Sequence, residues 1–246
     1  MPPRLYCPDL SSTGTATLTD AEAHHGKDVL RLSSGAAVEL FNGRGLVAEA
    51  VVQVVGRREL SCQVLSARTE PEPTPRVTLA TAVPKGERFD WLVEKATELG
   101  VSRLIPLITE RSSVDPRDSK LSRLRQTVIA ACKQCRRAHL MELTEATRWQ
   151  DFLKGAAGHS LFIAHPDGSQ HSDIGNLMNP SGDANEVFLL VGPEGGFTAG
   201  EIDQATASGG RLVSLGQHLL RIETAGMLLA SWVLLSRLVA RGSARR

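Results

Sequence analysis

The segment from Glu186 to Phe197, which reads EVFLLVGPEGGF, constrains the fold more than any other stretch of the chain. Five of its first six residues are apolar, as is typical of a short strand buried on both faces, and the run ends at Gly192. Glycines let a backbone approach a ligand closely, and Thr198 with Glu201 has the spacing of a capping box that starts a helix. The sequence therefore predicts a strand, a glycine loop and a helix N-terminus that together form a ligand cradle.

This cradle matches neither common nucleotide motif, because it lacks both the GK[ST] ending of a phosphate loop and the G-x-G-x-x-G of a dinucleotide site. On this segment alone, a tight turn between strand and helix is the alternative. A second segment, Leu215 to Ala225 (LGQHLLRIETA), follows a short apolar strand at Leu212 to Leu215 and precedes another helix. A separation of about twenty residues is typical of neighbouring β-α units, so we expect both loops at one edge of a parallel sheet.

Strand and helix patterns alternate from residue 77 onward. Apolar runs at Val77 to Val83, Val101 to Thr109 and Leu161 to His165 predict strands, and helical spacing marks two helices between them, the first of which ends at Gly100. This alternation indicates a parallel sheet with helices on both faces. The final helix, from about Ile222 to Ala240, is apolar around most of its circumference, which fits either core packing or a subunit interface.

The first seventy residues predict a small β-rich domain. Two β-prone runs flank Asn42 to Gly45, a strong hairpin signal, and another strand follows at Glu59 to Ala67. The stretch around Pro71, Pro73 and Pro75 cannot continue a helix or a strand ladder. We therefore expect a domain at residues 1–70, a linker at 71–76 and a second domain at 77–246.

Composition favours a cytoplasmic globular protein. Of the 246 residues 41% are hydrophobic and 22% are charged, no apolar run reaches the length of about 20 residues that a bilayer requires, and MPPRLYCPDL lacks a signal-peptide core. Cys132 and Cys135 form a C-x-x-C within a helical pattern, without a second pair or a ligand cluster. We therefore expect no metal site.

Charge is concentrated locally. The net charge is +1, yet Arg117 to Arg137 holds seven basic residues against one acid, Asp118. This basic stripe suits a phosphate backbone, although a solvated helix face is the usual explanation for such a pattern. We take Arg123, Arg136 and Arg137 as candidates for RNA contact.

Several motifs in a fixed order resemble the RsmE family of 16S ribosomal RNA (uridine-N3) methyltransferases. They cover nearly the whole chain and comprise VLRL (Val29 to Leu32), LFNGRG (Leu40 to Gly45), KGERFDWLVEKATELGV (Lys85 to Val101), ITERSSV (Ile108 to Val114), AACKQCRR (Ala130 to Arg137), GPEGGF with Glu201, and LG with LRIETA. Three residues depart from the family pattern, since Lys133 replaces a usual glutamate, Arg136 a usual glycine and Met141 a usual proline. These departures put the local loop geometry in doubt.

The resemblance implies a PUA-like RNA-binding β-barrel followed by a knotted methyltransferase domain of the SPOUT superfamily, with its trefoil knot. It implies S-adenosyl-L-methionine as cofactor, a homodimer built beside the last helix, and methylation of N3 of a uridine in 16S ribosomal RNA within the 30S subunit. The family would thus act in ribosomal RNA processing during ribosome biogenesis. Two alternatives stay open: a non-catalytic RNA-binding or ribosome-assembly factor, and a methyltransferase with another RNA target.

The resemblance also implies site residues. Those expected to bind the cofactor lie in three loops and a helix start: Ala164, His165, Pro166, Gly192, Gly195, Gly196, Leu215, Gly216, Leu220, Thr224 and Ala225. In the β-rich domain Arg4, Arg31 and Arg44 are candidates for RNA contact, with solvated arginines as the alternative. Because negative charge spreads over the uracil oxygens as N3 loses its proton, Arg221 is the expected stabilising cation, and Glu194 is expected to orient Arg221 or the base.

Overall fold

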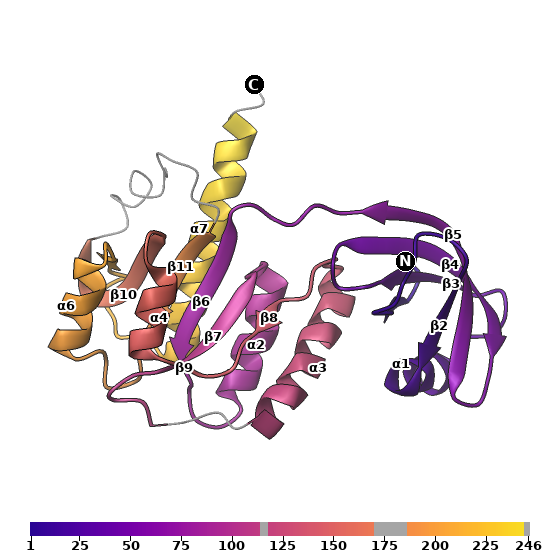
Figure 1. The fold of residues 1–246 in the computed structure, drawn as a ribbon, viewed down its shortest axis with the longest axis horizontal. Coiled ribbons are helices and arrows are strands. Elements are labelled where there is room, and N and C mark those ends of the chain that lie inside the picture. Colours follow the sequence, from indigo (N-terminus) through magenta and orange to yellow (C-terminus); the bar gives the residue numbers. More distant parts are fainter. Residues whose placement is uncertain (114–117, 170–185, 244–246) are drawn as a thin grey trace. The chain divides into compact units, whose positions relative to one another are not determined.

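The computed structural model describes residues 1–113, 118–169 and 186–243, and the chain divides into two compact units. The first unit comprises Met1–Glu72 with Ile129–Leu140, and the second comprises Pro73–Val128 with Met141–Arg246 (Figure 1). The long helix α3 (Asp118–Cys135) contributes to both, because its residues up to Val128 belong to the second unit and those from Ile129 to the first. Among the described residues, no helix is long and apolar enough to cross a membrane.

The described residues of the first unit form a five-stranded sheet in the order β1-β3-β4-β5-β2. Its elements are β1 (Arg4–Tyr6), β2 (Thr15–Thr19), α1 (Asp20–His24), the π-helix η1 (His25–Val29), β3 (Ala37–Phe41), β4 (Leu46–Val55) and β5 (Glu59–Thr69). The predicted hairpin is confirmed, since β3 and β4 pair antiparallel around Asn42. The Asn42 side-chain Oδ1 accepts hydrogen bonds from the backbone N–H groups of Arg44 and Leu46, at 2.8 and 3.1 Å.

Alternating side chains of this sheet build the core of the first unit. In β2, Ala16 and Leu18 are buried while the threonines on either side are exposed, as the two-residue period of a strand requires. Leu5, Leu40 and Leu60 are fully buried in the same core. Cys62 packs there as an apolar residue, and burial raises the pKa of its thiol to about 11.

The described residues of the second unit form a mainly parallel α/β arrangement. The elements not yet given are β6 (Arg76–Ala82), α2 (Arg88–Leu99), β7 (Arg103–Ile108), β8 (Glu142–Leu143), β9 (Thr147–Arg148), α4 (Trp149–Ala156), β10 (Ser160–Ser169), β11 (Glu186–Val191), α6 (Ala199–Ala207), β12 (Arg211–Val213) and α7 (Ile222–Ser243). The strand order is β12-β10-β11-β6-β7-β8, with β9 paired to β7, and every pairing in this sheet is parallel. The predicted parallel sheet is therefore confirmed.

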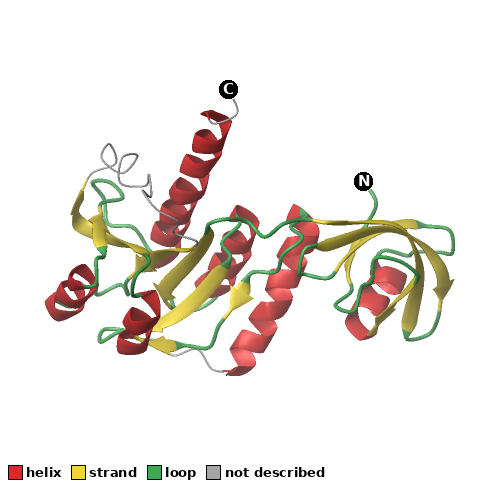
Figure 2. Ribbon diagram, turned by 45° about the horizontal axis from the view of Figure 1, so that its top comes forward, coloured by secondary structure: helices red, strands yellow, loops and turns green. Residues whose placement is uncertain are grey.

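Helices cover both faces of this sheet (Figure 2). Side chains from α4 and α6 join those of alternate strand residues, such as Ala80 and Leu190, in one buried cluster. On the other face α7 packs against α2, β6 and β11, and Gly226 brings its backbone close to the side chains of Leu79 and Leu92. Leu79 and Ala80 thus point to opposite faces, which explains why β6 is buried at every position from Val77 to Ala82.

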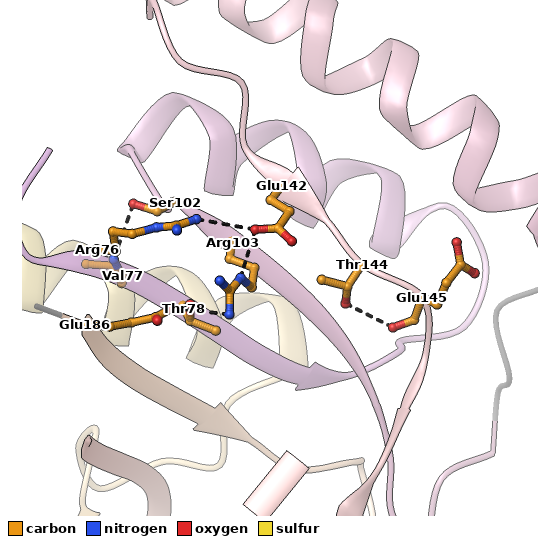
Figure 3. A network of polar contacts seen from close by, with 9 residues as sticks. All are labelled: Arg76, Val77, Thr78, Ser102, Arg103, Glu142, Thr144, Glu145 and Glu186. Atoms are coloured by element: carbon orange, nitrogen blue, oxygen red, sulfur yellow. Dashed lines mark hydrogen bonds and ion pairs between the residues drawn. The ribbon is translucent and has the colours of Figure 1, made fainter. Parts of the chain in front are cut away.

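A network of ion pairs and hydrogen bonds connects the amino ends of the strands (Figure 3). Glu142 accepts from Arg103 at 2.9 Å and from Arg76 at 3.3 Å, while Arg103 also pairs with Glu186 at 3.5 Å. Glu186 in turn accepts a hydrogen bond from the Thr78 hydroxyl. Charged groups at this edge of the sheet thus pair with one another. In open α/β sheets, ligands bind at the opposite edge, which the carboxyl ends of the strands form.

Two expectations need correction. The loops after β11 and β12 do leave the same edge, but their strands are not neighbours, because β10 pairs with both and lies between them. The expected third loop at Ala164 to Pro166 lies within β10, where pairing with β12 is interrupted between Ala164 and Ser169. The irregular stretch still lies beside the two loops.

Candidate active site

The glycine loop after β11 is a tight turn held from two sides. Gly196 donates its backbone N–H to the Pro193 carbonyl at 2.8 Å, and its φ of 69° lies in the left-handed region that favours glycine. Arg111 donates to the Gly195 carbonyl at 2.7 Å, and the buried Phe197 ring packs against Trp149 with centroids 5.3 Å apart. The loop is therefore preorganised by contacts that lie outside it.

The buried carboxylate of Glu201 anchors the helix behind the loop. It completes the predicted capping box of α6, accepting from the Thr198 backbone N–H at 2.9 Å while Thr198 Oγ1 accepts from the Glu201 N–H. Its other oxygen accepts from the Glu110 N–H at 2.9 Å. One carboxylate thus joins the start of α6 to the segment that follows β7, and the predicted capping box is confirmed.

The second loop runs from Ser214 to Arg221. Gly216 has a φ of 126°, and the Ser214 hydroxyl donates to its carbonyl at 3.4 Å. The loop ends where α7 begins, and the Ala225 N–H donates to the Arg221 carbonyl at 2.8 Å. Arg221 therefore stands at the N-terminus of the helix that the sequence marked as unusually apolar.

The two loops and the irregular stretch of β10 enclose one cavity of about 520 Å³, which we call the first cleft. A volume of this size is that of a pocket for a small organic ligand or cofactor. The predicted cofactor residues that line it are Ala164, His165, Pro166, Gly192, Gly195, Gly196, Leu215, Gly216, Leu220 and Ala225. Segments that are far apart in the sequence thus converge on one ligand-sized hollow.

A second cleft, of about 560 Å³, adjoins the first. It is lined by Arg88, Trp91, Leu219, Leu220, Arg221, Glu223 and Thr224. Leu219, Leu220 and Arg221 line both clefts, so the two hollows share a wall. The remaining predicted cofactor residue, Thr224, lines this cleft instead of the first.

Of the two candidate catalytic residues, Arg221 lies in the wall that the clefts share, and Glu194 lines the first cleft only. Arg221 is exposed, and no described acid forms an ion pair with its guanidinium. Glu194 Oε1 lies 3.8 Å from Arg88, whose guanidinium also lies 3.9 Å from Glu223. Sequence reasoning gave no role to Arg88, Trp91 or Glu223, although all three fall within the KGERFDW and LRIETA motifs.

Three of the arginines predicted to contact RNA lie instead in a partly buried cluster of the first unit. The Glu39 carboxylate lies 3.2 Å from Arg4 and 2.9 Å from Arg136, and the Arg4 guanidinium lies 4.4 Å from the centre of the Phe41 ring. Arg4 also donates to the Arg137 carbonyl at 3.2 Å. Burial lowers the pKa of both Arg4 and Arg137, and the Glu39 charge partly offsets this for Arg4. These contacts give the three arginines a structural role, and their contact with RNA stays a prediction.

The other candidates are exposed. Arg31 lies on the surface, Arg44 donates to the Pro8 carbonyl at 2.7 Å, and Arg123 pairs with Asp90. Further charges of the basic stripe are also paired: Arg125 with Glu145 at 3.1 Å, and Lys133 with Glu22 at 2.7 Å. Arg117 and the side chain of Lys120 lie outside the described residues. The stripe is thus less positive than the helix sequence alone indicates.

The departures at Arg136 and Lys133 have structural explanations. Arg136 follows the last residue of α3 with a φ of 63°, the conformation that glycine adopts most readily after a helix. The ion pair with Glu39 holds it there, just as the pair with Glu22 holds Lys133. Met141 is buried beside the Thr97 hydroxyl.

Among the described residues, no group of three or more His, Cys, Asp or Glu side chains is placed to hold a metal ion.

Comparisons with known proteins agree with this architecture. A sequence profile for the RNA methyltransferase domain matches residues 70–234, and one for the RNA methyltransferase PUA domain matches residues 18–65. The chain is 33% identical to ribosomal RNA small subunit methyltransferase E of Synechocystis, over 90% of this chain and 73% of that protein. Its identity to the Bacillus subtilis protein of the same name is 28%, over 93% of each chain.

Solved structures resemble the whole fold. A methyltransferase from Legionella pneumophila, in complex with the cofactor SAM, superimposes with a TM-score of 0.85 at 30% identity and covers 96% of this chain and 98% of that one. Ribosomal RNA small subunit methyltransferase E from Neisseria gonorrhoeae, bound to S-adenosylmethionine, gives a TM-score of 0.84 at 28% identity, over 97% and 98%.

Proposed function

The chain belongs to the ribosomal RNA small subunit methyltransferase E family, and we propose that it transfers a methyl group from S-adenosylmethionine to N3 of a uridine in 16S ribosomal RNA. The observation that carries the proposal is the convergence of the two glycine loops on the first cleft. The loops join β11 to α6 and β12 to α7, and they meet although β10 lies between the two strands in the sheet. Their meeting point is explained by a ligand that both of them bind.

The first cleft fits this cofactor. Glycines at positions 192, 195, 196 and 216 leave the loop backbone open to close approach, and the apolar side chains of Leu215 and Leu220 line the same hollow. The cofactor supplies an electrophilic methyl group on a sulfonium. The chain's own part is to hold that group in line with the acceptor nitrogen, a step that needs no metal ion.

Arg221 supplies the charge that the reaction requires. As N3 of uracil loses its proton, negative charge spreads onto O2 and O4, and a guanidinium at a helix N-terminus stabilises that charge. Arg221 stands at the start of α7, on the wall between the clefts. Glu194 acts on this site through Arg88, the cation that lies beside its carboxylate.

We propose that the exposed arginines bind RNA. Arg31 and Arg44 on the β-rich unit and Arg123 on α3 present positive charge to phosphates, whose binding is largely electrostatic. Arg4, Arg136 and Arg137 remain candidates for RNA contact, although Arg4 and Arg136 also pair with Glu39, and Arg4 donates to the Arg137 carbonyl. Because its proposed substrate is the 30S subunit, we expect the protein to act in the cytoplasm.

We also propose a homodimer along α7. Leu228, Trp232 and Leu235 recur at the spacing of one helix face, and Leu235 remains 59% exposed. The adjoining face, which includes Leu229 and Val233, is fully buried, and α7 packs there against the sheet and α2. A second copy of the chain would cover the exposed apolar stripe.

Nucleoside mass spectrometry of 16S ribosomal RNA tests the function. Cells that lack this gene should lose one 3-methyluridine that the parent strain contains, and a plasmid copy should restore it. The same plasmid with Arg221→Ala should restore much less. An unchanged nucleoside profile in the deletion strain would contradict the proposal and favour an assembly factor without catalytic activity.

A further inference from the structure

We propose that the second cleft receives the base that is methylated, and that the carboxylate of Glu223 accepts the proton from its N3. The inference rests on the proposed function, and it adds the acceptor site and the proton acceptor. Three observations carry it: a buried carboxylate without a donor, a wall shared with the cofactor cleft, and a set of side chains that complements uracil.

The Glu223 carboxylate is buried but incompletely satisfied. The residue is 7% exposed, and its Oε2 receives no hydrogen bond from any described residue. The other oxygen lies 3.9 Å from Arg88, which is too long for a hydrogen bond. A buried carboxylate oxygen without a donor is rare, and it marks a place where a ligand N–H is missing.

The second cleft lies where an acceptor must lie. It shares Leu219, Leu220 and Arg221 with the first cleft, so a base held in it lies beside the cofactor. Leu219 is 89% exposed and Leu220 36%, although both are large apolar residues. The exposure of these two leucines is explained if the cofactor occupies the first cleft and the base occupies the second during the reaction.

The side chains of the second cleft complement uracil. Trp91 is 46% exposed and offers an indole face on which a base can stack. Glu223 accepts from N3–H, and Arg221 lies near enough to the same cleft to stabilise the base oxygens. Cytosine has a lone pair at N3 in place of the N–H, so the carboxylate would repel it. The same residue therefore selects uridine and removes its proton.

The proposed step balances. Glu223 takes the N3 proton, the N3 electron pair forms the new bond to the methyl carbon, and the carbon–sulfur bond breaks with its electron pair left on sulfur. The positive sulfonium becomes a neutral thioether, and the negative charge of Glu223 is neutralised by the proton. Water later removes that proton. Arg88 holds the carboxylate in place between Glu194 and the start of α7.

Glu223→Gln tests the proposal, because glutamine keeps the size of the side chain but is not a base. With 30S subunits from cells that lack the gene, we expect the single-turnover rate at saturating RNA and cofactor to fall about a hundredfold or more. Affinity for S-adenosylmethionine, measured by calorimetry, and the thermal unfolding midpoint should stay close to wild type. Glu98→Gln, on the exposed surface of α2, is the matched control and should keep the wild-type rate.

A second readout separates proton removal from a structural role. Fluorine at C5 of uracil makes N3–H more acidic, so subunits that carry 5-fluorouridine should recover part of the lost rate with Glu223→Gln and gain little with the wild type. Trp91→Ala should raise the KM for subunits and leave cofactor affinity unchanged. Full activity of Glu223→Gln, or a loss explained by cofactor affinity or unfolding, would overturn the inference. A wild-type protein that methylates no uridine would instead overturn the proposed function.

Discussion

At the scale of single residues, Arg88 joins the two acids of the site. Its guanidinium lies 3.8 Å from Glu194 and 3.9 Å from Glu223, so it connects the glycine loop to the start of α7. Arg221, next to this pair, makes no ion pair with a described acid. Arg88 is thus a cation held in place by two acids, whereas Arg221 is available to stabilise negative charge that forms on the base during the reaction.

Arg221→Ala should lower turnover and leave cofactor affinity nearly unchanged, because its partner charge appears only as N3 loses its proton. By analogy with the loss of one oxyanion donor, the rate should fall about a hundredfold or more, and Arg221→Lys should recover part of it. Single-turnover rates at saturating RNA and cofactor measure this. A near-normal rate with weaker RNA binding would make Arg221 a phosphate contact instead.

The left-handed conformation of Arg136 gives a second prediction. Both Arg136→Gly and Arg136→Ala lose the ion pair with Glu39, but only alanine keeps the steric cost of a φ of 63°. We expect the glycine variant to be more stable than the alanine variant by about 1 kcal/mol in urea unfolding. An alanine variant of equal or greater stability would show that this residue is not strained.

At the scale of elements, the strands, the hairpin and the capping box could be predicted because they depend on local pattern. Val77 to Val83, for example, differs by one residue at each end from β6. The position of β10 between β11 and β12 could not be predicted, because sequence spacing does not determine which strands pair. Glu223 was missed for a similar reason: its burial and its distance from Arg88 arise only when α2 packs against α7.

The Glu201 anchor can be tested in the same element. Glu201→Gln leaves one of two backbone N–H groups, at Thr198 or Glu110, facing an amide N–H₂. Stability should fall by about 1–3 kcal/mol, and affinity for S-adenosylmethionine should fall with it because the glycine loop loses its support. Asp203→Asn, on the exposed face of α6, is the control. Unchanged stability of Glu201→Gln would show that the anchor contributes nothing.

At the scale of the whole molecule, helix α3 contributes residues to both units, which the linear division at residues 71–76 does not anticipate. Its basic residues pair with acids from other parts of the chain, such as Glu22, Glu39 and Asp90. Such pairs are invisible in a helix sequence read alone. The knot and the homodimer stay predictions of the family resemblance.

RNA affinity should depend on arginines that are exposed. The double variant Arg31→Ala/Arg44→Ala should weaken binding to 30S subunits and reduce the slope of log affinity against log salt by up to roughly one unit for each phosphate that no longer meets an arginine. Cofactor affinity should not change. If the slope is unchanged, these arginines are solvated surface groups, and RNA binds elsewhere on the chain.

Methyl transfer by the purified protein tests the central claim most directly. The protein would be mixed, in the presence of a chelator, with S-adenosylmethionine that carries a deuterated methyl group and with 30S subunits from cells that lack the gene. Digestion and mass spectrometry should then find one 3-methyluridine that carries the deuterium label. Label on another nucleoside, or no label until a divalent ion is added back, would contradict the account.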